Sequence, residues 1–118
     1  MAEHNFTGTF GEDMAAAWFI DRNYNILEKN WRFSHWEVDI IAEKNNVLHF
    51  IEVKTRRSNT FGHPENDVSK KKMRFLMSSA EQYLIEHPNW KLIQFDILAI
   101  TMLPGMPTEF FLIEDVGL

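Results

Sequence analysis

The sequence predicts an α/β fold in which a central mixed sheet of about five strands is flanked by helices. Three observations predict it. Two β-rich runs flank an Asn-Asn pair, two other segments place apolar residues at helical spacing, and two further β-rich runs follow the second of these. A hydrophobic content of 45% and a charged content of 25% are ordinary for a folded globular chain. The expected order is α-β-β-β-α-β-β, which belongs to the α/β class.

The first predicted element is a helix over residues 9–23. Thr9 and Glu12 have the spacing of a capping box, and the alanines at 15–17 have high helix propensity. Asn23 is a stop signal. Residues 25–33 follow as the first strand.

The next two strands form a predicted hairpin over residues 37–43 and 47–55. Asn45 and Asn46 lie between them, and asparagine tolerates the positive φ that a tight hairpin turn requires. Residues 56–67 contain Gly62 and Pro64 and are expected to form a loop.

The second half of the chain again predicts a helix followed by strands. A helix is predicted from about Ser69, and Pro88 prevents it from continuing. Strands are expected over 91–100 and 109–114, with a turn at Pro104-Gly105.

Length and composition narrow the function. The 118 residues predict one domain over 1–118. The absence of cysteine excludes disulfides, thiolate metal sites and a cysteine nucleophile. No apolar run reaches membrane-spanning length and no signal-peptide pattern begins the chain, so we expect a cytoplasmic protein without a membrane partner.

Charge is unevenly distributed. The net charge of −5 counts against a protein that simply coats phosphates. Between Lys54 and Arg74, however, seven basic residues accompany only two acids. Such a basic segment is either a binding feature or a solvated face.

Acidic residues occupy central positions of the predicted hairpin. A two-residue turn places Asp39 opposite Glu52, with Lys54 on the same face. Like charges directly opposite each other are destabilising, and a divalent cation would relieve the repulsion. The alternative is a solvated face, although the same register puts Ile41 and Phe50 on that face.

An aspartate on one strand followed by Glu52-Val53-Lys54 on the next resembles the PD-(D/E)xK nuclease superfamily, which has the restriction-endonuclease-like fold. The chain resembles more closely the YraN-like family, predicted nucleases that are distantly similar to archaeal Holliday junction resolvases. The similarity runs from about Phe10 to Ile100. It is carried by Gly11-Glu12, Glu37-Val-Asp39-Ile-Ile-Ala, Phe50-Ile-Glu52-Val-Lys54-Thr-Arg56, Phe61-Gly62-x-Pro64, Lys70-Lys71, Ala80-x-x-Tyr83-Leu84 and Phe95-Asp96.

The resemblance implies that Asp39, Glu52 and the Val53 carbonyl bind Mg²⁺ or Mn²⁺. Lys54 would orient water and stabilise transition-state charge, or it would pair with Glu37 across the strands. Glu12 has two open interpretations. Related resolvases use a helix glutamate in the site, but Glu12 could also only close the capping box.

Basic residues are the predicted contacts to nucleic-acid phosphates. Lysines in the first turn of a helix are disfavoured by the helix dipole, whereas a bound anion would favour them. The expected contacts are Lys70, Lys71, Arg74, Arg56 and Arg57.

The sequence therefore predicts a metal-dependent endonuclease acting on DNA, with branched or junction DNA included. The alternative is a non-catalytic nucleic-acid-binding or assembly module that keeps the nuclease fold. A third candidate, a small-molecule phosphohydrolase, is disfavoured because the sequence contains no signal of a dedicated pocket. A homodimer is possible because the related resolvases are dimers. Two positions depart from the family pattern: Trp36 replaces a glycine and Gln94 replaces an arginine.

Overall fold

The computed structural model describes the backbone of residues 3–57 and 70–116, and side chains from residue 10 onward within those ranges. It confirms the predicted order of elements and the mixed sheet. The elements are α1 (Glu3–Asp21), β1 (Asn25–Phe33), β2 (Trp36–Lys44), β3 (Val47–Arg56), α2 (Lys70–Glu86), β4 (Leu92–Thr101) and β5 (Glu109–Ile113). The predicted loop motif Phe61-Gly62-x-Pro64 and the start at Ser69 lie outside the described residues.

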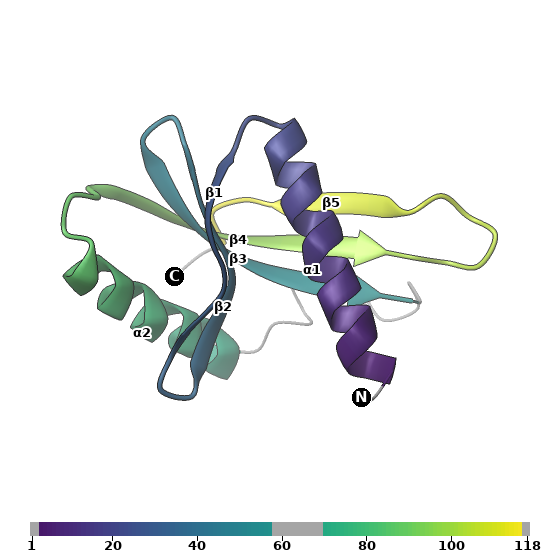
Figure 1. Cartoon of the computed structure of the whole chain (residues 1–118), viewed down its shortest axis with the longest axis horizontal. Helices are drawn as coiled ribbons and strands as arrows, with labels where there is room; N and C mark the ends of the chain where they lie inside the picture. Colours follow the sequence, from purple (N-terminus) through teal and green to yellow (C-terminus); the bar gives the residue numbers. More distant parts are fainter. Residues whose placement is uncertain (1–2, 58–69, 117–118) are drawn as a thin grey trace.

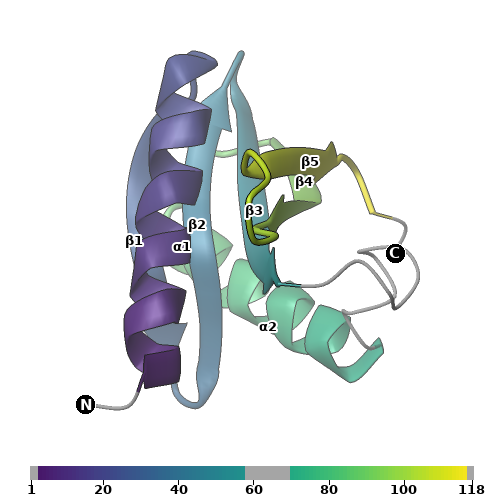
Figure 2. The ribbon, with the colours of Figure 1, turned by 90° about the vertical axis from the view of Figure 1, so that its right-hand side faces the viewer.

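The five strands lie in the spatial order β1-β2-β3-β4-β5 (Figure 1). Only β3 and β4 are parallel, because α2 connects them as a crossover; the other neighbours are antiparallel. Figure 2 shows α1 and α2 on opposite sides of the sheet. Neither described helix is long and apolar enough to cross a membrane.

Each helix covers its own apolar cluster. The α1-side cluster contains buried residues of the helix and of three strands, among them Ala15, Ala16, Phe19, Ile40, Ala42, Ile51, Leu98 and Ile100. The α2-side cluster contains Val38, Ile41, Leu48, Phe50, Leu76, Ala80, Tyr83 and Phe95. Burial of these two surfaces is the main force that holds both helices on the sheet.

The β2–β3 turn forms as predicted. Asn45 and Asn46 have φ values of 53° and 66°, as a two-residue hairpin turn requires. The predicted pairing holds from Lys44 opposite Val47 to Ile40 opposite Ile51.

Beyond Ile40 and Ile51 the two strands separate. β2 continues paired only with β1, and β3 continues paired only with β4. The predicted ladder pairs of Asp39 with Glu52 and of Glu37 with Lys54 are therefore wrong. We call this opening between residues 36–39 and 52–56 the fork.

The alternation of side chains in β2 is interrupted at the fork. Val38 and Ile41 both pack on the α2 side, whereas Ile40 packs on the α1 side. In the neighbouring β1, Asn30 has a φ of 54°, which is unusual within a strand. The expectation that Ile41 shares the face of Asp39 is wrong because this irregularity shifts the pattern.

The predicted start of the first helix is also wrong. α1 begins at Glu3, so Thr9 lies inside the helix and cannot cap it. No proline precedes Thr9 to interrupt the helix. A capping signature alone does not prevent the helix from extending further toward the N-terminus. The predicted end is close, since Asn23 has a left-handed φ of 70°.

Candidate metal centre

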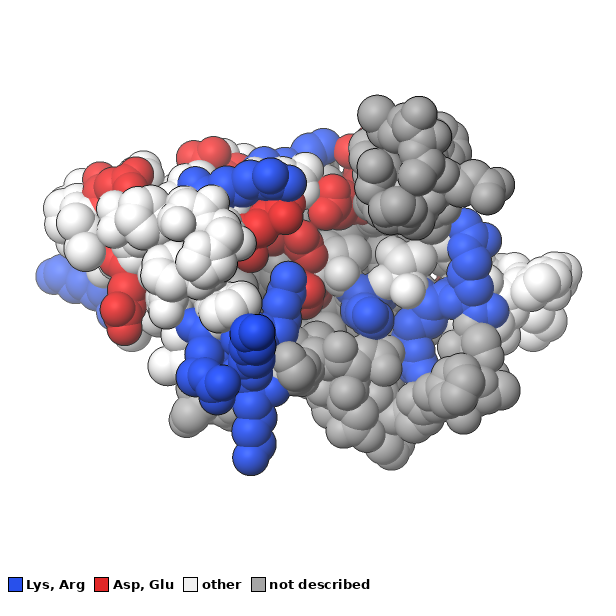
Figure 3. Space-filling view, turned by 90° about the horizontal axis from the view of Figure 1, so that it is seen from below, with Lys and Arg blue, Asp and Glu red and all other residues white. Residues whose placement is uncertain are grey.

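Three carboxyl groups from two elements meet at the fork. Glu12 of α1 and Glu37 and Asp39 of β2 each offer an oxygen atom, and these atoms lie within 4.8 Å of one another. Figure 3 shows acidic side chains gathered near the middle of this end of the molecule, with basic side chains on either side of them. The Glu12 carboxyl group therefore lies beside the β2 acids, and it does not close a capping box with Thr9, which lies inside α1.

A close approach of α1 to β3 brings Glu12 there. A Cβ atom at Gly11 would lie 2.5 Å from the Thr55 hydroxyl oxygen, which is closer than real Cβ atoms come. Only glycine therefore fits at this crossing without a shift. Ala15 follows one turn later and is fully buried against the sheet.

Asp39 is held by the backbone of β3. Its Oδ2 accepts a hydrogen bond of 2.8 Å from the Val53 N–H. The carboxylate replaces the ladder partner that the N–H loses where β2 diverges. Glu37 does not pair with Lys54; its Oε2 lies 3.6 Å from an Arg32 guanidinium nitrogen on β1.

Glu52 approaches the same place from β3. The residue is 9% exposed, and its Oε1 is buried without a hydrogen-bond partner in the described part of the chain. Its Oε2 lies 3.4 Å from Lys72 Nζ on α2. A buried carboxylate oxygen without a partner costs free energy unless it is protonated or binds a cation.

The electrostatics of the cluster raise two pKa values. Burial, followed by the charge of Asp39, raises the pKa of Glu52 to about 8, although the Lys72 ammonium acts in the opposite direction. Burial, followed by the charge of Asp39, also raises the pKa of Glu12 to about 7. Asn30 opposes this by a hydrogen bond to Glu12.

This donor set fits a hard divalent cation. All four side chains offer carboxylate oxygens, which Mg²⁺ and Mn²⁺ prefer. Glu12, Glu37 and Asp39 are close enough to share one ion. Glu52 is within electrostatic reach of Asp39 and supplies an oxygen that has no other partner. The Val53 carbonyl stays a predicted ligand.

The predicted basic residues have different environments. Lys54 is half-buried on β3, and Arg56 is buried with 9% of its surface exposed. Lys70 and Arg74 are exposed on α2, and Arg57 is exposed beyond β3. Lys71 Nζ lies 5.7 Å from the centre of the Phe75 ring.

Sequence reasoning missed two contributors to the site. Glu37 was assigned only as a partner of Lys54, although its two-residue spacing from Asp39 places both acids on one side of β2. Lys72 is not among the predicted site residues, and its Nζ lies 3.4 Å from Glu52 Oε2. No sequence signal distinguishes Lys72 from Lys70 and Lys71.

Gln94, which stands where the family pattern has an arginine, contacts a buried carboxylate. Its side-chain amide donates to Asp96 Oδ1 at 2.9 Å, and Asp96 also accepts from the Asp115 N–H at 2.9 Å. Asp96 Oδ2 lies 2.7 Å from His49 Nδ1, and both side chains are buried. Gln94 thus provides a neutral donor to a buried carboxylate.

The fold and site define an α/β protein with carboxylates gathered where its sheet opens. The chain belongs to the uncharacterised protein family UPF0102, whose sequence profile matches residues 11–100. This confirms the YraN-like part of the resemblance. A UPF0102 protein of Flavobacterium psychrophilum is 44% identical over 100 residues, which are 85% of this chain and 84% of the relative. One of Phocaeicola vulgatus is 44% identical over 110 residues, 93% and 88% of the two chains. One of Bacteroides thetaiotaomicron is 37% identical over 117 residues, 99% and 84% of the two chains.

Proposed function

We propose that this protein is a divalent-metal-dependent endonuclease that hydrolyses nucleic-acid phosphodiester bonds, with DNA as the favoured substrate. The observation that carries the proposal is the convergence of Glu12, Glu37 and Asp39 at the fork, with the buried, unpartnered Oε1 of Glu52 on the neighbouring strand. The resemblance of Asp39 and Glu52-Val53-Lys54 to the PD-(D/E)xK pattern supports it.

In this proposal Glu12, Glu37, Asp39 and Glu52 would hold Mg²⁺ or Mn²⁺. The ion would supply Lewis-acid polarisation of the scissile phosphate and a lowered pKa for attacking water. The hydrogen bond from the Val53 N–H fixes the Asp39 carboxylate, so its position does not depend on the ion. Lys54 would stabilise charge that develops on the phosphate oxygens.

The exposed cations on α2 would bind the flanking phosphates. Lys70 begins the helix, where free backbone N–H groups add to its attraction for an anion. These cations explain how a chain of net charge −5 could still attract nucleic acid locally.

A non-catalytic binding module is the second candidate. The observation that favours it is the contact between Lys72 and Glu52, because a lysine can neutralise this carboxylate without a metal. In that case nucleic-acid binding would not depend on divalent ions, and Glu52 would be replaceable.

A cleavage panel distinguishes the two. Branched, single-stranded and duplex DNA and single-stranded RNA are incubated with Mg²⁺ or Mn²⁺, using wild type, Asp39→Asn, Glu52→Gln and the control Glu81→Gln. Glu81 is an exposed glutamate on α2, away from the cluster. We expect wild type and Glu81→Gln to cleave while the two site variants do not. Binding without cleavage of any substrate would favour the binding module, whereas equal cleavage by wild type and Glu52→Gln would remove Glu52 from the proposed metal centre.

A further inference from the structure

Four aromatic side chains meet at the turn between β1 and β2, next to the first turns of α2. The ring of Trp36 lies 5.8 Å from Phe33 and 5.2 Å from His35, measured between centroids. Phe75 of α2 lies 5.7 Å from His35 and 6.4 Å from Trp36. We call these four residues the ring cluster.

The ring cluster is not a core cluster. Phe33 is 37% exposed and His35 is exposed, while Trp36 and Phe75 are half-buried. The Trp36 indole N–H is buried without an acceptor in the described part of the chain. Among the described residues, the Trp36 ring is thus held by ring contacts and not by a hydrogen bond.

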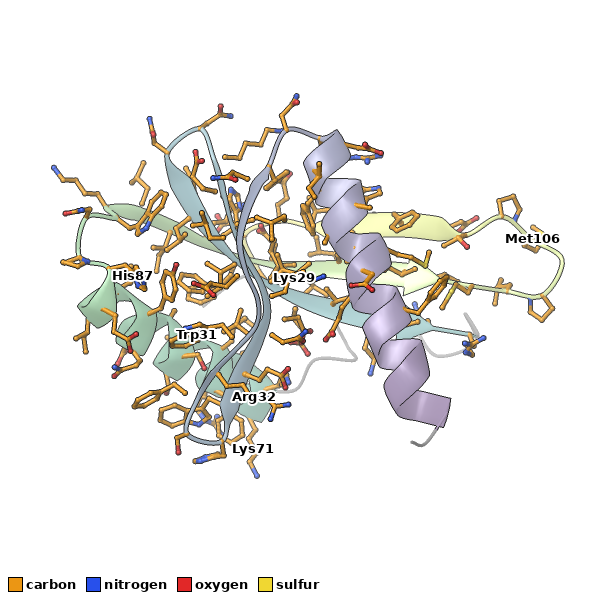
Figure 4. All side chains as sticks on the ribbon, viewed as in Figure 1. Lys29, Trp31, Arg32, Lys71, His87 and Met106 are labelled. Atoms are coloured by element: carbon orange, nitrogen blue, oxygen red, sulfur yellow. The ribbon has the colours of Figure 1, made fainter. Side chains whose placement is uncertain are left out.

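One cation lies beside the Phe75 ring, and a second exposed cation directly precedes Phe33 in β1. Lys71 Nζ lies 5.7 Å from the Phe75 ring centre, and the Arg32 side chain is 72% exposed. Figure 4 shows Arg32 and Lys71 at the end of the molecule where β1 turns into β2. Exposed rings next to exposed cations suit a partner that combines flat π faces with negative charge, as nucleotides do.

The ring cluster also lies close to the metal centre along the chain. Trp36 directly precedes Glu37, and Lys72, which contacts Glu52, precedes Phe75 by three residues on α2. That separation is about 4.5 Å along a helix. The ring cluster and the Lys72–Glu52 contact therefore lie on neighbouring turns of α2.

We propose that the ring cluster binds unpaired bases of a nucleic acid beside the metal centre. Bases inside a duplex have both faces covered by their neighbours, so only unpaired bases can stack on the protein. Combined with the proposed nuclease function, on which this step rests, the substrate class is single-stranded nucleic acid or branched nucleic acid with unpaired nucleotides near the scissile phosphate.

Binding is tested without metal, so that cleavage plays no part. The probes are a fluorescent thymidine strand of about 12 nucleotides, an abasic strand of equal charge, a duplex of the thymidine strand and a glutamate peptide of equal charge. We expect wild type to bind the thymidine strand about 10-fold more tightly than the abasic strand, as stacking of one base would give.

The double variant Phe33→Ala/His35→Ala should lose this preference and keep the salt dependence of binding, because it leaves every lysine and arginine in place. Phe33→Leu/His35→Leu, which keeps the apolar volume, should lose it as well. Phe111→Ala is the matched control, since Phe111 is 58% exposed on β5. Circular dichroism verifies that each variant folds.

Three results would overturn the inference: equal binding of the thymidine and abasic strands by wild type, equal binding of the peptide, or the same loss in Phe111→Ala. The proposed function is judged separately. A protein that shows the base preference but cleaves nothing would overturn the nuclease proposal and leave this inference standing.

Discussion

The two oxygens of Glu52 have different environments, and this difference supports the proposed metal centre. Oε2 lies 3.4 Å from Lys72, whereas Oε1 has no partner among the described residues. One ammonium at this distance does not fully compensate the burial of the Glu52 carboxylate. The pKa of Glu52 is therefore raised to about 8. A proton or a divalent ion at Oε1 would complete the coordination of the group.

Lys72 and a divalent ion should compete for Glu52. We expect Lys72→Met to bind Mg²⁺ about 5-fold more tightly at pH 8.5, because the half-exposed ion pair is worth about 1 kcal/mol or less. The loss of Lys72 also favours a proton on Glu52, but a lysine repels a divalent ion more strongly than it repels a proton. Isothermal titration calorimetry measures the affinity.

Two variants control for general electrostatics. Lys72→Arg keeps the charge and should keep the wild-type affinity, and Lys70→Met removes a charge that is exposed at the helix start. If Lys70→Met tightens Mg²⁺ binding as much as Lys72→Met does, the contact with Glu52 is not the cause.

Lys54 is expected to act on the reaction and not on the ion. Its side chain is half-buried one residue beyond Val53, and the structure shows no ion pair between it and a described acid. We expect Lys54→Met to lower the cleavage rate by about 10²–10³ while Mg²⁺ affinity changes little. Single-turnover cleavage and calorimetry give the two numbers. A variant that cleaves normally but melts early would assign Lys54 a structural role.

At the scale of elements, the crossing of α1 over β3 fixes where Glu12 lies. Gly11→Ala adds a Cβ atom that would lie 2.5 Å from the Thr55 hydroxyl. The overlap costs about 1–3 kcal/mol, whereas alanine gains about 1 kcal/mol of helix propensity over glycine. Stability alone therefore responds weakly, and we expect the displaced helix to appear mainly as weaker Mg²⁺ binding.

A second substitution makes this prediction specific. In Gly11→Ala/Thr55→Ala the nearest remaining atom is the Cβ of residue 55, at 3.7 Å, which is an ordinary contact. Mg²⁺ affinity should return to the wild-type value in calorimetry. Failure of the double variant to recover would mean that the hydroxyl contact does not set the position of α1.

The start of α2 presents the next prediction. Lys70 is exposed at the first position of the helix and Lys71 is exposed beside it. Lys70→Ala/Lys71→Ala should weaken DNA binding without unfolding the chain. Each lost phosphate contact should reduce the slope of log K against log salt by about 0.9, as measured by fluorescence anisotropy. An unchanged slope would show that these lysines form only a solvated face.

The sequence predicts the β2–β3 hairpin but not the fork at its open end. Strand periodicity and the Asn45-Asn46 turn predicted the hairpin and its pairing as far as Ile40, because local patterns and turn chemistry determine them. The fork could not be predicted. It coincides with a left-handed φ at Asn30 in β1 and with the change of side-chain alternation between Val38 and Ile40, and neither has a signal in the sequence.

At the scale of the whole molecule, the acids of the fork and the cations at the start of α2 come close together through the contact between Glu52 and Lys72. Glu12, Glu37 and Asp39 meet at the fork with Glu52 interacting with Asp39, and the first turns of α2 carry three lysines and an arginine. Without a metal, the acids repel one another and repel phosphate. The protonation of Glu12 and Glu52 should therefore control both the stability of the fold and its affinity for metal.

The pH dependence follows from the raised pKa values. Glu52 and Glu12 have pKa values of about 8 and about 7 in the fold, against 4.5 for the ordinary group. Between these limits the folded chain binds more protons than the unfolded chain. The stability contribution of these groups is therefore lost as the pH rises from about 4.5 to about 8, and the metal-free protein should melt earlier at pH 8 than at pH 5.5.

Mn²⁺ should reverse this loss, because the ion binds the deprotonated acids. At ten times its dissociation constant at pH 8, the ion adds about 1.4 kcal/mol, which corresponds to about 5 °C in melting temperature. The same Mn²⁺ concentration at pH 5.5 should give a much smaller shift, since protons then occupy Glu12 and Glu52.

Glu52→Gln should melt no earlier than wild type without metal at pH 8, and it should lose the Mn²⁺ shift. Glu81→Gln should behave as wild type. If Mn²⁺ does not change the wild-type melting temperature at pH 8, these carboxylates do not bind a common ion. The same conclusion would follow if Glu52→Gln kept the Mn²⁺ shift.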